Sequence, residues 1–464
     1  MSFPKYPAYR DSGVEWLGEV PEHWAVHPLK RAIARIESGT SVNAADFPAE
    51  PGSLGVLKTS CVYTGKFDWA ENKTVDDEDL SRVSCPLRKN TLIVSRMNTP
   101  DLVGATGLVS EAPNGIFLPD RLWQVYFEGD HSPEFLFYFT KSREYREQVK
   151  MACSGTSASM QNLGQDDFRS LLFAEPPKRE QTQIARFLDH ETARIDTLIK
   201  EQQRLIELLK EKRQAVIAHA VTKGLDPSVP MKDSGVEWLG EVPAHWEVTQ
   251  IKRRCELITD GAHVSPETEG GVYCFVSTKD VSDEGIDFEG CLRTSPPSYQ
   301  YLVKAGCQPA PGDVLFSKDG TIGRTIVVSE GAPDFVVASS LIIIRPEYEQ
   351  LLPGFLHALC QSWVVAQQVE SFVKGAGLPR LSIQNILKVI GIFPPIEEQE
   401  NIADFLQQEH EVTRQLTSEA CRAMELLKER RSALISAAVT GKIDLRDWQP
   451  PASTPAPIRE QETA

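Results

Sequence analysis

The chain has 464 residues, 41% of them hydrophobic, and its 49 Lys and Arg against 65 Asp and Glu give a formal net charge of −16. This length suffices for two to four domains, and neither a membrane-spanning run of roughly 20 apolar residues nor a secretory signal within residues 1–10 is expected. Nine cysteines without a Cys-x-x-Cys motif argue against a disulfide framework or a zinc site and favour a cytosolic protein.

The first recognisable segment recurs later in the chain. Residues 11–24 and 233–246 match at thirteen of fourteen positions, at an offset of 222. Further matches follow in the same order, and the offset falls only to 218 by the ELLKEKR and ELLKERR segments that start at Glu207 and Glu425. Because ordered matches at a nearly constant offset indicate an internal repeat, we interpret the chain as one unit that is duplicated in tandem.

Each copy begins with a globular part of about 165 residues. Short apolar runs bounded by Gly, Pro and Asp predict strands at residues 92–95, 122–127, 273–277, 314–317 and 341–344. Residues 134–151 and 353–372 have the composition of helices. Together these elements predict an α/β or α+β domain in each copy. Residues 40–90 and 262–311 show no convincing mutual match, which indicates that this part of the two copies has diverged.

Each copy ends with a long helix. Residues 178–221 and 398–439 contain neither Gly nor Pro. At positions 184, 188, 191, 195, 198, 202, 205, 209, 212 and 216, and again 218 residues later, seven of ten residues are apolar, which predicts a coiled-coil seam. We favour an intramolecular, antiparallel pair of helices, although the pattern does not fix the orientation and also allows a seam between chains.

Proline and glycine mark the boundaries of these parts. Pro176-Pro177 and Pro394-Pro395 end the preceding strands, and Gly224 and Gly441 end the long helices. The predicted fold is therefore α+β, with two globular domains that alternate with two long helices. The expected divisions are residues 1–177, 178–227, 228–393, 394–445 and a disordered tail, rich in Pro and Ala, at residues 446–464.

The repeated motifs resemble one protein family. The opening D-S-G-V-E-W-L-G-E-V-P-x-H-W, a strand that ends in S-[RK], and P-P-x-x-E-Q-x-x-I-A-x-F-L before a long helix all occur twice. In this combination they resemble the specificity subunit of type I restriction-modification enzymes, over nearly the whole chain.

The resemblance implies a function without catalysis. Each globular part would be a target-recognition domain for one half of a bipartite DNA site, and the paired helices would act as a spacer. These helices would bind two methyltransferase subunits, which carry S-adenosylmethionine, and endonuclease/translocase subunits would complete the enzyme. The chain itself would need no cofactor and no metal. Because residues 40–90 and 262–311 differ, we expect two different half-sites.

The candidate DNA-binding residues are basic or polar and follow strands or occupy loops. Basic clusters at the same position of each copy suit phosphate contacts, and the loops after Ser95 and Ser317 could reach base edges, although solvated strand faces remain an alternative. Lys374 and Arg380 flank a glycine-containing loop. The full set is Lys30, Arg31, Arg96, Asn98, Thr99, Lys252, Arg253, Arg254, Lys318, Arg324, Lys374 and Arg380.

Other repeated residues suit structural roles or protein contacts. Trp16, Trp24, Trp238 and Trp246 recur in both copies, and such identical placement favours framework packing over base stacking. The candidate subunit contacts lie at the start of the long helices, where a simpler role for the carboxylates is to complement the helix dipole. These candidates are Glu180, Gln181, Glu398 and Gln399.

Catalytic motifs do not emerge from the sequence. There is no G-x-x-x-x-G-K-[ST] phosphate loop and no G-x-G-x-x-G. Residues 98–101 and 295–298 resemble a methyltransferase N-P-P-aromatic motif but lack the aromatic residue that stacks a flipped base. His23 and His27 have the spacing of metal ligands, but the second copy has His245 and Thr249 instead.

The negative charge weakens the case for tight DNA binding by this chain alone, because Lys and Arg supply most non-specific affinity. Since none of the expected domains is strongly basic, the DNA-facing surface should be a local patch, and tight binding should require the partner subunits. Two alternatives remain: a coiled-coil scaffold that binds only proteins, and an unrecognised nuclease or methyltransferase.

Overall fold

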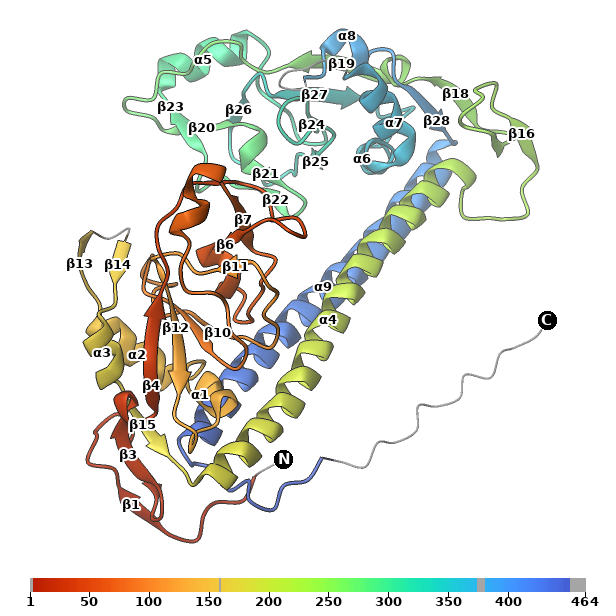
Figure 1. Cartoon of the computed structure of the whole chain (residues 1–464). Helices are drawn as coiled ribbons and strands as arrows, with labels where there is room; N and C mark the ends of the chain where they lie inside the picture. Colours follow the sequence, from red (N-terminus) through yellow and green to blue (C-terminus); the bar gives the residue numbers. More distant parts are fainter. Residues whose placement is uncertain (1–2, 158–159, 374–379, 451–464) are drawn as a thin grey trace. The chain divides into compact units, whose positions relative to one another are not determined.

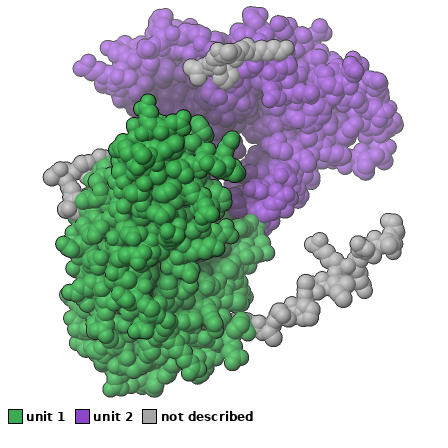
Figure 2. Space-filling view, in the orientation of Figure 1, with its two compact units in different colours: residues 1–202, 422–464 green, residues 203–421 purple. Residues whose placement is uncertain are grey.

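The structure is a computed structural model that describes residues 3–157, 160–373 and 380–450 (Figure 1). The chain divides into two compact units (Figure 2). Unit 1 comprises residues 1–202 and 422–464, and unit 2 comprises residues 203–421. Each unit therefore combines one globular region with part of each of the two long helices.

A four-stranded antiparallel sheet forms the centre of unit 1. Its strand order is β10-β8-β12-β4, formed by Thr106–Leu108, Leu92–Ser95, Leu122–Phe127 and Ile33–Ser38. All four residues of β8 are buried, as its continuous apolar run predicts.

The centre of unit 2 is a sheet of the same design. Its order is β25-β24-β27-β19, again antiparallel throughout, formed by Thr325–Val327, Val314–Ser317, Leu341–Pro346 and Cys255–Asp260. The predicted strands at residues 92–95, 122–127, 314–317 and 341–344 are confirmed, and that at residues 273–277 forms β20, Tyr273–Val276.

A second sheet in each unit occupies the region whose sequences do not match. In unit 1, β6 (Gly55–Leu57) runs parallel to β11 (Ile116–Phe117) and antiparallel to β7 (Asn72–Val75). In unit 2, β20 runs parallel to β26 (Phe335–Val337) and antiparallel to β23 (Leu292–Thr294). The two regions thus share a strand arrangement despite their divergence in sequence.

The remaining strands and short helices also occur largely in equivalent pairs. Two-stranded sheets β1-β2 and β3-β15 in unit 1 correspond to β16-β17 and β18-β28 in unit 2. Their bounds are Tyr9–Asp11, Glu19–Pro21, Ala25–Pro28 and Leu172–Glu175 in unit 1, and Met231–Asp233, Glu241–Pro243, Glu247–Gln250 and Ile390–Phe393 in unit 2. The other small elements are β5 Ala44–Ala45, β9 Met97–Asn98, β13 Ser154–Ser157, β14 Met160–Asn162, α3 Gln165–Ser170, β21 Val281–Ser282, β22 Gly285–Ile286, α5 Pro296–Lys304, α8 Ile383–Ile386, η2 Thr59–Val62, η3 Asp77–Arg82 and η5 Thr278–Asp280.

Two predicted helices are each broken into two. Residues 134–151 form α1 (Pro133–Phe139) and α2 (Arg143–Ala152), and residues 353–372 form α6 (Pro353–Gln361) and α7 (Trp363–Phe372). A serine stands at each break. The Ser142 side chain accepts a hydrogen bond from the Tyr145 N–H, and the Ser362 hydroxyl donates to the Leu359 carbonyl. Serine competes for backbone partners in this way and so favours a new helix start over a continuous helix.

The two long helices are α4 (Lys178–Lys223) and α9 (Ile396–Val439). They pair antiparallel, because Arg431 Nε lies 3.4 Å from Asp196 Oδ1 within unit 1, and Lys212 Nζ lies 3.3 Å from Glu409 Oε2 within unit 2. Gly224 (φ 78°) and Gly441 (φ 74°) adopt the left-handed conformation that ends each helix, as predicted.

The predicted seam is wrong at positions 198, 205 and 212 of α4 and at positions 416 and 430 of α9, which are exposed. Ile206 is only 6% exposed, whereas its neighbour Leu205, which was assigned to the seam, is 41% exposed. Likewise Leu198 is 37% and Leu416 42% exposed. The half-buried or buried stripe instead follows residues 195, 199, 202, 206, 209, 213 and 216 of α4 and the equivalent positions 218 residues later in α9. Apolar doublets such as Leu205-Ile206 fit either spacing, so the sequence pattern alone did not separate them.

The C-terminal segment is ordered further than predicted. Trp448 packs edge-on against Phe187 of α4, with ring centroids 5.2 Å apart, and Gln183 donates a hydrogen bond to its carbonyl. The predicted disordered tail is therefore wrong for residues 446–448, and residues 451–464 lie outside the described part. Within the described residues, no helix is long and apolar enough to span a bilayer.

Candidate DNA-recognition sites

The repeated basic clusters lie on short helices that precede an edge strand of each central sheet. In unit 1, η1 (Leu29–Arg31) exposes Lys30 and Arg31, with Arg31 Nε 3.5 Å from Glu175 Oε2. In unit 2, η4 (Ile251–Arg254) exposes Lys252 and Arg253. Arg254 is only partly exposed, because Gln350 accepts a hydrogen bond of 2.5 Å from its Nη1 and Glu247 accepts another from its Nη2.

The predicted loop residues lie at the opposite end of the same sheets. Strand β4 begins next to η1 and ends at Ser38, which pairs with Trp123, while Leu122 pairs with Ser95. Because a strand rises about 3.3 Å per residue, the six residues of β4 separate the two groups by about 20 Å. The pairing of β19, β27 and β24 repeats this arrangement in unit 2. The structure therefore does not bring the basic clusters and the loops together.

In unit 1 the loop after β8 is held by side-chain hydrogen bonds. Arg96 donates from Nε to the Asp120 carbonyl over 2.7 Å. Asn98 is only 8% exposed, and its amide donates to the Tyr63 hydroxyl (2.8 Å) and the Ser95 hydroxyl (3.1 Å). Thr99 follows and is exposed. Asn98 thus holds the loop in shape, and Thr99 and the partly exposed Arg96 are accessible.

In unit 2 the equivalent loop uses different contacts. Lys318 is 3% exposed and its ammonium group forms a 2.5 Å ion pair with Asp260. Arg324 donates to the Val281 carbonyl over 2.6 Å, and Arg380, half exposed, forms a 3.0 Å ion pair with Asp319. Lys374 lies outside the described residues. Lys318 is therefore buried and paired with Asp260. The accessible basic residues of this loop are Arg380 and the partly exposed Arg324.

One residue that sequence analysis missed, Lys279, lies beside this loop. A polar hollow of about 400 Å³ in unit 2 is lined by Thr278, Lys279, Thr321, Arg324 and Ser340, among others. Lys279 is exposed. It lies on η5, whose start is fixed by a capping box in which Ser277 and Asp280 bond reciprocally. The S-x-x-D pattern of that box was the available signal.

Ion pairing dominates the electrostatics beneath the unit 2 loop. Burial acts to raise the pKa of Asp260, but hydrogen bonds from Lys318 and His263 outweigh it, so the pKa of Asp260 lies below its ordinary value. The carboxylate is thus charged at neutral pH and neutralises Lys318. The surface that remains carries only a local positive charge from Lys279, Arg324 and Arg380, which agrees with the acidic overall composition.

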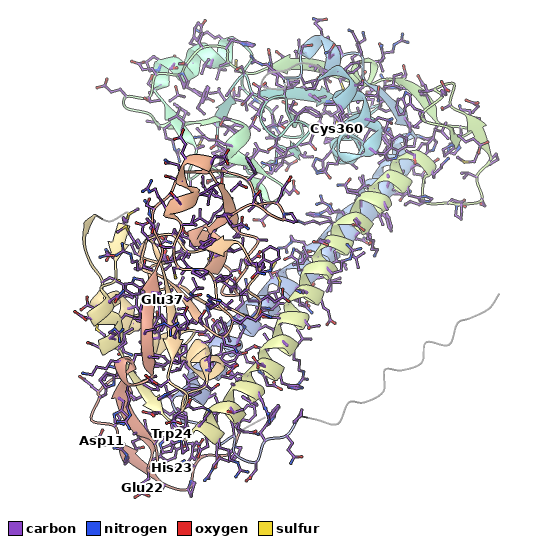
Figure 3. The ribbon with its side chains drawn as sticks, in the orientation of Figure 1. Asp11, Glu22, His23, Trp24, Glu37 and Cys360 are labelled. Carbon is purple, nitrogen blue, oxygen red and sulfur yellow. The ribbon has the colours of Figure 1, made fainter. Side chains whose placement is uncertain are left out.

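The repeated opening segment is anchored to the start of each long helix. Glu180 accepts hydrogen bonds from the Trp24 indole (3.0 Å) and the Tyr6 hydroxyl (3.2 Å), and its other oxygen lies 2.7 Å from His23 Nε2. Glu398 meets the Trp246 indole (2.8 Å) and His245 in the same way. Trp24 and Trp246 are each 1% exposed, so these two tryptophans are framework residues, whereas Trp16 and Trp238 are over one-third exposed. Figure 3 shows Trp24 and His23 close together in unit 1.

The neighbouring glutamines are buried connectors. Gln181 (1% exposed) accepts from the Ser132 N–H and donates to the Pro176 carbonyl. Gln399 (0% exposed) accepts from the Leu352 N–H and donates to the carbonyls of Gln350 and Pro394. Because these amides are fully bonded within their own units, the expectation that Gln181 and Gln399 contact partner subunits directly is not supported. Glu180 and Glu398 remain candidates through their partly exposed edges.

Other candidate motifs have structural explanations. His27 Nε2 lies 3.8 Å from Glu175, and His23 pairs with Glu180, so the two histidines serve separate contacts. Across residues 3–157, 160–373 and 380–450, no group of three His, Cys, Asp or Glu could hold a metal ion. Ser295 of the Ser-Pro-Pro segment caps α5 by accepting from the Ser298 N–H.

Comparisons with known proteins agree with this arrangement. A family model for the type I restriction modification DNA specificity domain matches residues 32–208 and again residues 243–420. The chain is similar to the EcoKI type I restriction enzyme specificity subunit of Escherichia coli, at 21% identity over 92% of this chain and 90% of that protein. It is also similar to the EcoBI specificity subunit, at 23% identity, and that match spans 62% of either protein.

Solved structures show the same fold. A chain from a study of complex assembly and conformational transition of the type I R-M system aligns with a TM-score of 0.68, at 17% identity over 90% of this chain and 98% of the other. The HsdS subunit from Thermoanaerobacter tengcongensis aligns with a TM-score of 0.50, at 18% identity over 91% and 98%. The two family matches cover well over half of the residues, and the chain therefore belongs to the family of type I restriction-modification DNA specificity subunits.

Proposed function

We propose that this chain recognises an asymmetric, two-part DNA sequence for a type I restriction-modification enzyme and performs no catalysis itself. Residues 1–177 and 228–393 would be the two target-recognition domains, residues 178–227 and 394–445 the helical spacer, and the complex would act in the cytoplasm. The family membership and the duplicated fold support this assignment.

The observation that carries the proposal is a constant framework with different residues at its tips. In unit 1, Met97 pairs with Asn162 between β9 and β14. In unit 2, Asp319 forms an isolated bridge with Arg380 at the equivalent place. Side chains with different donors and acceptors recognise different base edges. Two such sites in one chain thus suit two different half-sites, as in other bipartite readers.

We assign the direct DNA contacts to the accessible residues of these tips. Arg96 and Thr99 would contact the first half-site, and Lys279, Arg324 and Arg380 the second. Asn98 and Lys318 would position the loops from beneath. Lys30, Arg31, Lys252 and Arg253 are exposed at the other end of the sheets and would contact phosphates outside the half-site. Lys374 stays a candidate for the second half-site.

The two long helices, α4 and α9, offer a surface for the partner subunits. Leu198 on α4 and Leu426 on α9 are exposed in unit 1, and Leu416 on α9 and Leu208 on α4 are exposed in unit 2. These pairs are equivalent under the 218-residue repeat. Contiguous exposed apolar patches mark protein interaction sites, and we propose that these leucines contribute to such patches. Two equivalent surfaces would bind two identical methyltransferase subunits, and the endonuclease/translocase subunits would join that complex.

The docking surface can be tested by stoichiometry. We expect the double change Leu198→Glu and Leu426→Glu to leave one bound methyltransferase subunit instead of two, measured by native mass spectrometry of the co-expressed complex. The matched control changes exposed Glu201 and Glu429 to Gln, which should leave both subunits bound. Retention of two subunits by the leucine variant would contradict the docking surface.

The function itself is tested by a long-read map of DNA methylation in cells with and without this gene. Loss of one asymmetric two-part motif on deletion would support the proposal and give both half-sites. If the methylome is unchanged although the methyltransferase partner is expressed, the protein scaffold becomes the better account, and the acidic charge would favour it.

A further inference from the structure

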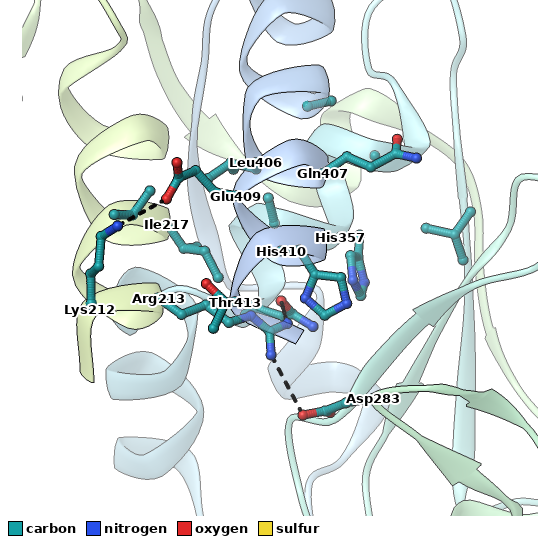
Figure 4. A pocket seen from close by; sticks show the side chains of 16 residues that line it. Lys212, Arg213, Ile217, Asp283, His357, Leu406, Gln407, Glu409, His410 and Thr413 are labelled. Atoms are coloured by element: carbon teal, nitrogen blue, oxygen red, sulfur yellow. Dashed lines mark hydrogen bonds and ion pairs between the residues drawn. The ribbon is translucent and has the colours of Figure 1, made fainter. Parts of the chain in front are cut away.

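Unit 2 contains a pocket of about 270 Å³ between the paired helices and the globular region (Figure 4). Its walls come from Ile217 of α4, Leu406 of α9 and Ala358 of α6, which are apolar, and from polar side chains of all three helices. An apolar cavity about half this size can bind benzene in other proteins, so the volume suits one aromatic ring with a substituent.

The internal repeat identifies the equivalent place in unit 1. Two glutamine contacts recur in both units. Gln181 accepts a hydrogen bond from the Ser132 N–H, and Gln399 accepts one from the Leu352 N–H. In the same way, Gln148 accepts from the Leu172 N–H, and Gln368 accepts from the Ile390 N–H. Both pairs of hydrogen bonds show that α1 and α2 of unit 1 correspond to α6 and α7 of unit 2, at a sequence offset of 220 residues. Tyr138 of unit 1 therefore corresponds to Ala358 of unit 2.

A tyrosine ring fills this place in unit 1. Tyr138 is 5% exposed, and its hydroxyl donates to Asp189 Oδ1 over 2.7 Å and lies 3.2 Å from the Thr192 hydroxyl. Unit 2 has the small Ala358 at this position, and the described residues around it leave a pocket of about 270 Å³ that Ala358 lines. The pocket thus lies where the Tyr138 ring lies in unit 1.

The polar partners of that phenol are also present in unit 2. At the offset of 218 that relates the long helices, Asp189 and Thr192 correspond to Gln407 and His410. Both Gln407 and His410 line the pocket, as Figure 4 shows. A glutamine amide and an imidazole can each accept a hydrogen bond from a hydroxyl group, and the amide can also donate one.

The charges around the pocket favour a neutral ligand. Arg213 Nη1 lies 3.8 Å from Asp283, and Lys212 Nζ lies 3.3 Å from Glu409, so both cations already have anionic partners. Burial, with the nearby Arg213 and His410, lowers the pKa of His357 to about 4, and burial lowers the pKa of His410. Both imidazoles are therefore neutral acceptors near pH 7.

We propose that this pocket binds a small phenol, with its ring in the place that Tyr138 occupies in unit 1 and its hydroxyl group bonded to Gln407 and His410. The site is independent of the DNA-recognition tips and of the proposed function, so either can fail without the other.

The probe is 4-methylphenol, which is a free tyrosine side chain. Isothermal titration calorimetry of the full chain should show one site at pH 7.5. A Tyr138→Ala variant should show a second site, and an Ala358→Tyr variant should show none. Ligand at ten times its dissociation constant should raise the unfolding temperature of the wild-type unit 2 by about 3–5 °C.

The controls separate the pocket from surface binding. Ala193→Tyr adds a tyrosine at an exposed position of α4 and should keep the single site. His410→Leu should weaken 4-methylphenol at least fivefold but leave toluene unchanged. The proposal is overturned if Ala358→Tyr still binds 4-methylphenol, if the wild-type chain binds none, or if toluene binds the wild-type chain as tightly.

Discussion

Unit 1 and unit 2 share a framework of sheet, opening segment and long helix. They differ in the loops at the tips and in the side chains Tyr138 and Ala358, which occupy equivalent positions. The indole-to-carboxylate anchor is nearly the same in both, at 3.0 Å from Trp24 to Glu180 and 2.8 Å from Trp246 to Glu398. The tips differ, with Met97 in one unit where Asp319 stands in the other. The contacts between sheet, opening segment and helix therefore define the fold of both units, while the loops differ between them.

The largest expected effect comes from breaking the shared anchor. Trp246→Ala should lower the free energy of unfolding of unit 2 by about 3–5 kcal/mol, because it leaves a cavity at a fully buried aromatic residue and removes the indole hydrogen bond to Glu398. Urea denaturation followed by circular dichroism measures it. Trp24→Ala should cost unit 1 a similar amount, whereas the half-exposed Trp238→Ala should cost less than about 1 kcal/mol. Unequal losses for the two anchors would mean that they are not equivalent.

The next largest loss of stability should come from a residue of the observed helix seam, and not from its exposed neighbour. Ile206→Ala should cost about 2–4 kcal/mol because Ile206 is buried between the helices. Leu205→Ala, one residue away and exposed, should change stability by no more than about 0.5 kcal/mol. Equal losses in urea melts of these two variants would show that the helices pair in the register that the sequence pattern had predicted.

A smaller effect on stability should depend on pH, because unit 2 has His357 where unit 1 has Phe137. Because the pKa of His357 in the folded chain is about 4, below its ordinary value of 6.5, the unfolded chain takes up more protons. Stability should thus fall as pH falls from 6.5 towards 4, by on the order of 2 kcal/mol. Groups facing His357 are Arg213, His410 and Asp283. His357→Phe, which copies Phe137 of unit 1, should flatten this pH profile in urea melts, and an unchanged slope would contradict the assignment.

The smallest effect is expected at an exposed ion pair. Lys212 pairs with Glu409 across the helices, but its side chain is 62% exposed. Lys212→Ala should therefore cost only about 0–1 kcal/mol, and less at high salt. A double-mutant cycle with Glu409→Ala measures the pair directly. A coupling well above 1 kcal/mol would show that this pair is a main determinant of helix pairing.

The repeat made most of the fold predictable. Local apolar runs such as residues 314–317 identified the central strands, and the absence of Gly and Pro identified both long helices. Register was harder, because Leu205 and Ile206 are equally apolar and only packing distinguishes them. The helix breaks at Ser142 and Ser362 were missed, because composition does not reveal where a helix is interrupted by one residue.

The candidate site was predictable in place but not in detail. The S-[RK] motifs pointed to the loops that follow β8 and β24, yet Lys318 is paired with Asp260, and that pairing depends on a residue 58 positions away. Lys279 was missed because its loop lies in the diverged region, where no internal match directs attention to it. The pocket beside Ala358 required the three-dimensional comparison with Tyr138.

The most direct test of the account is a methylation map for two single variants beside the wild-type chain. Arg380→Ala should relax or weaken recognition of one half of the two-part motif by about tenfold, and Thr99→Ala should affect only the other half, with circular dichroism confirming that both variants fold. Such separate effects would support two recognition tips on one shared framework. If both variants altered the same half, or changed neither half, the assignment of one half-site to each unit would be contradicted.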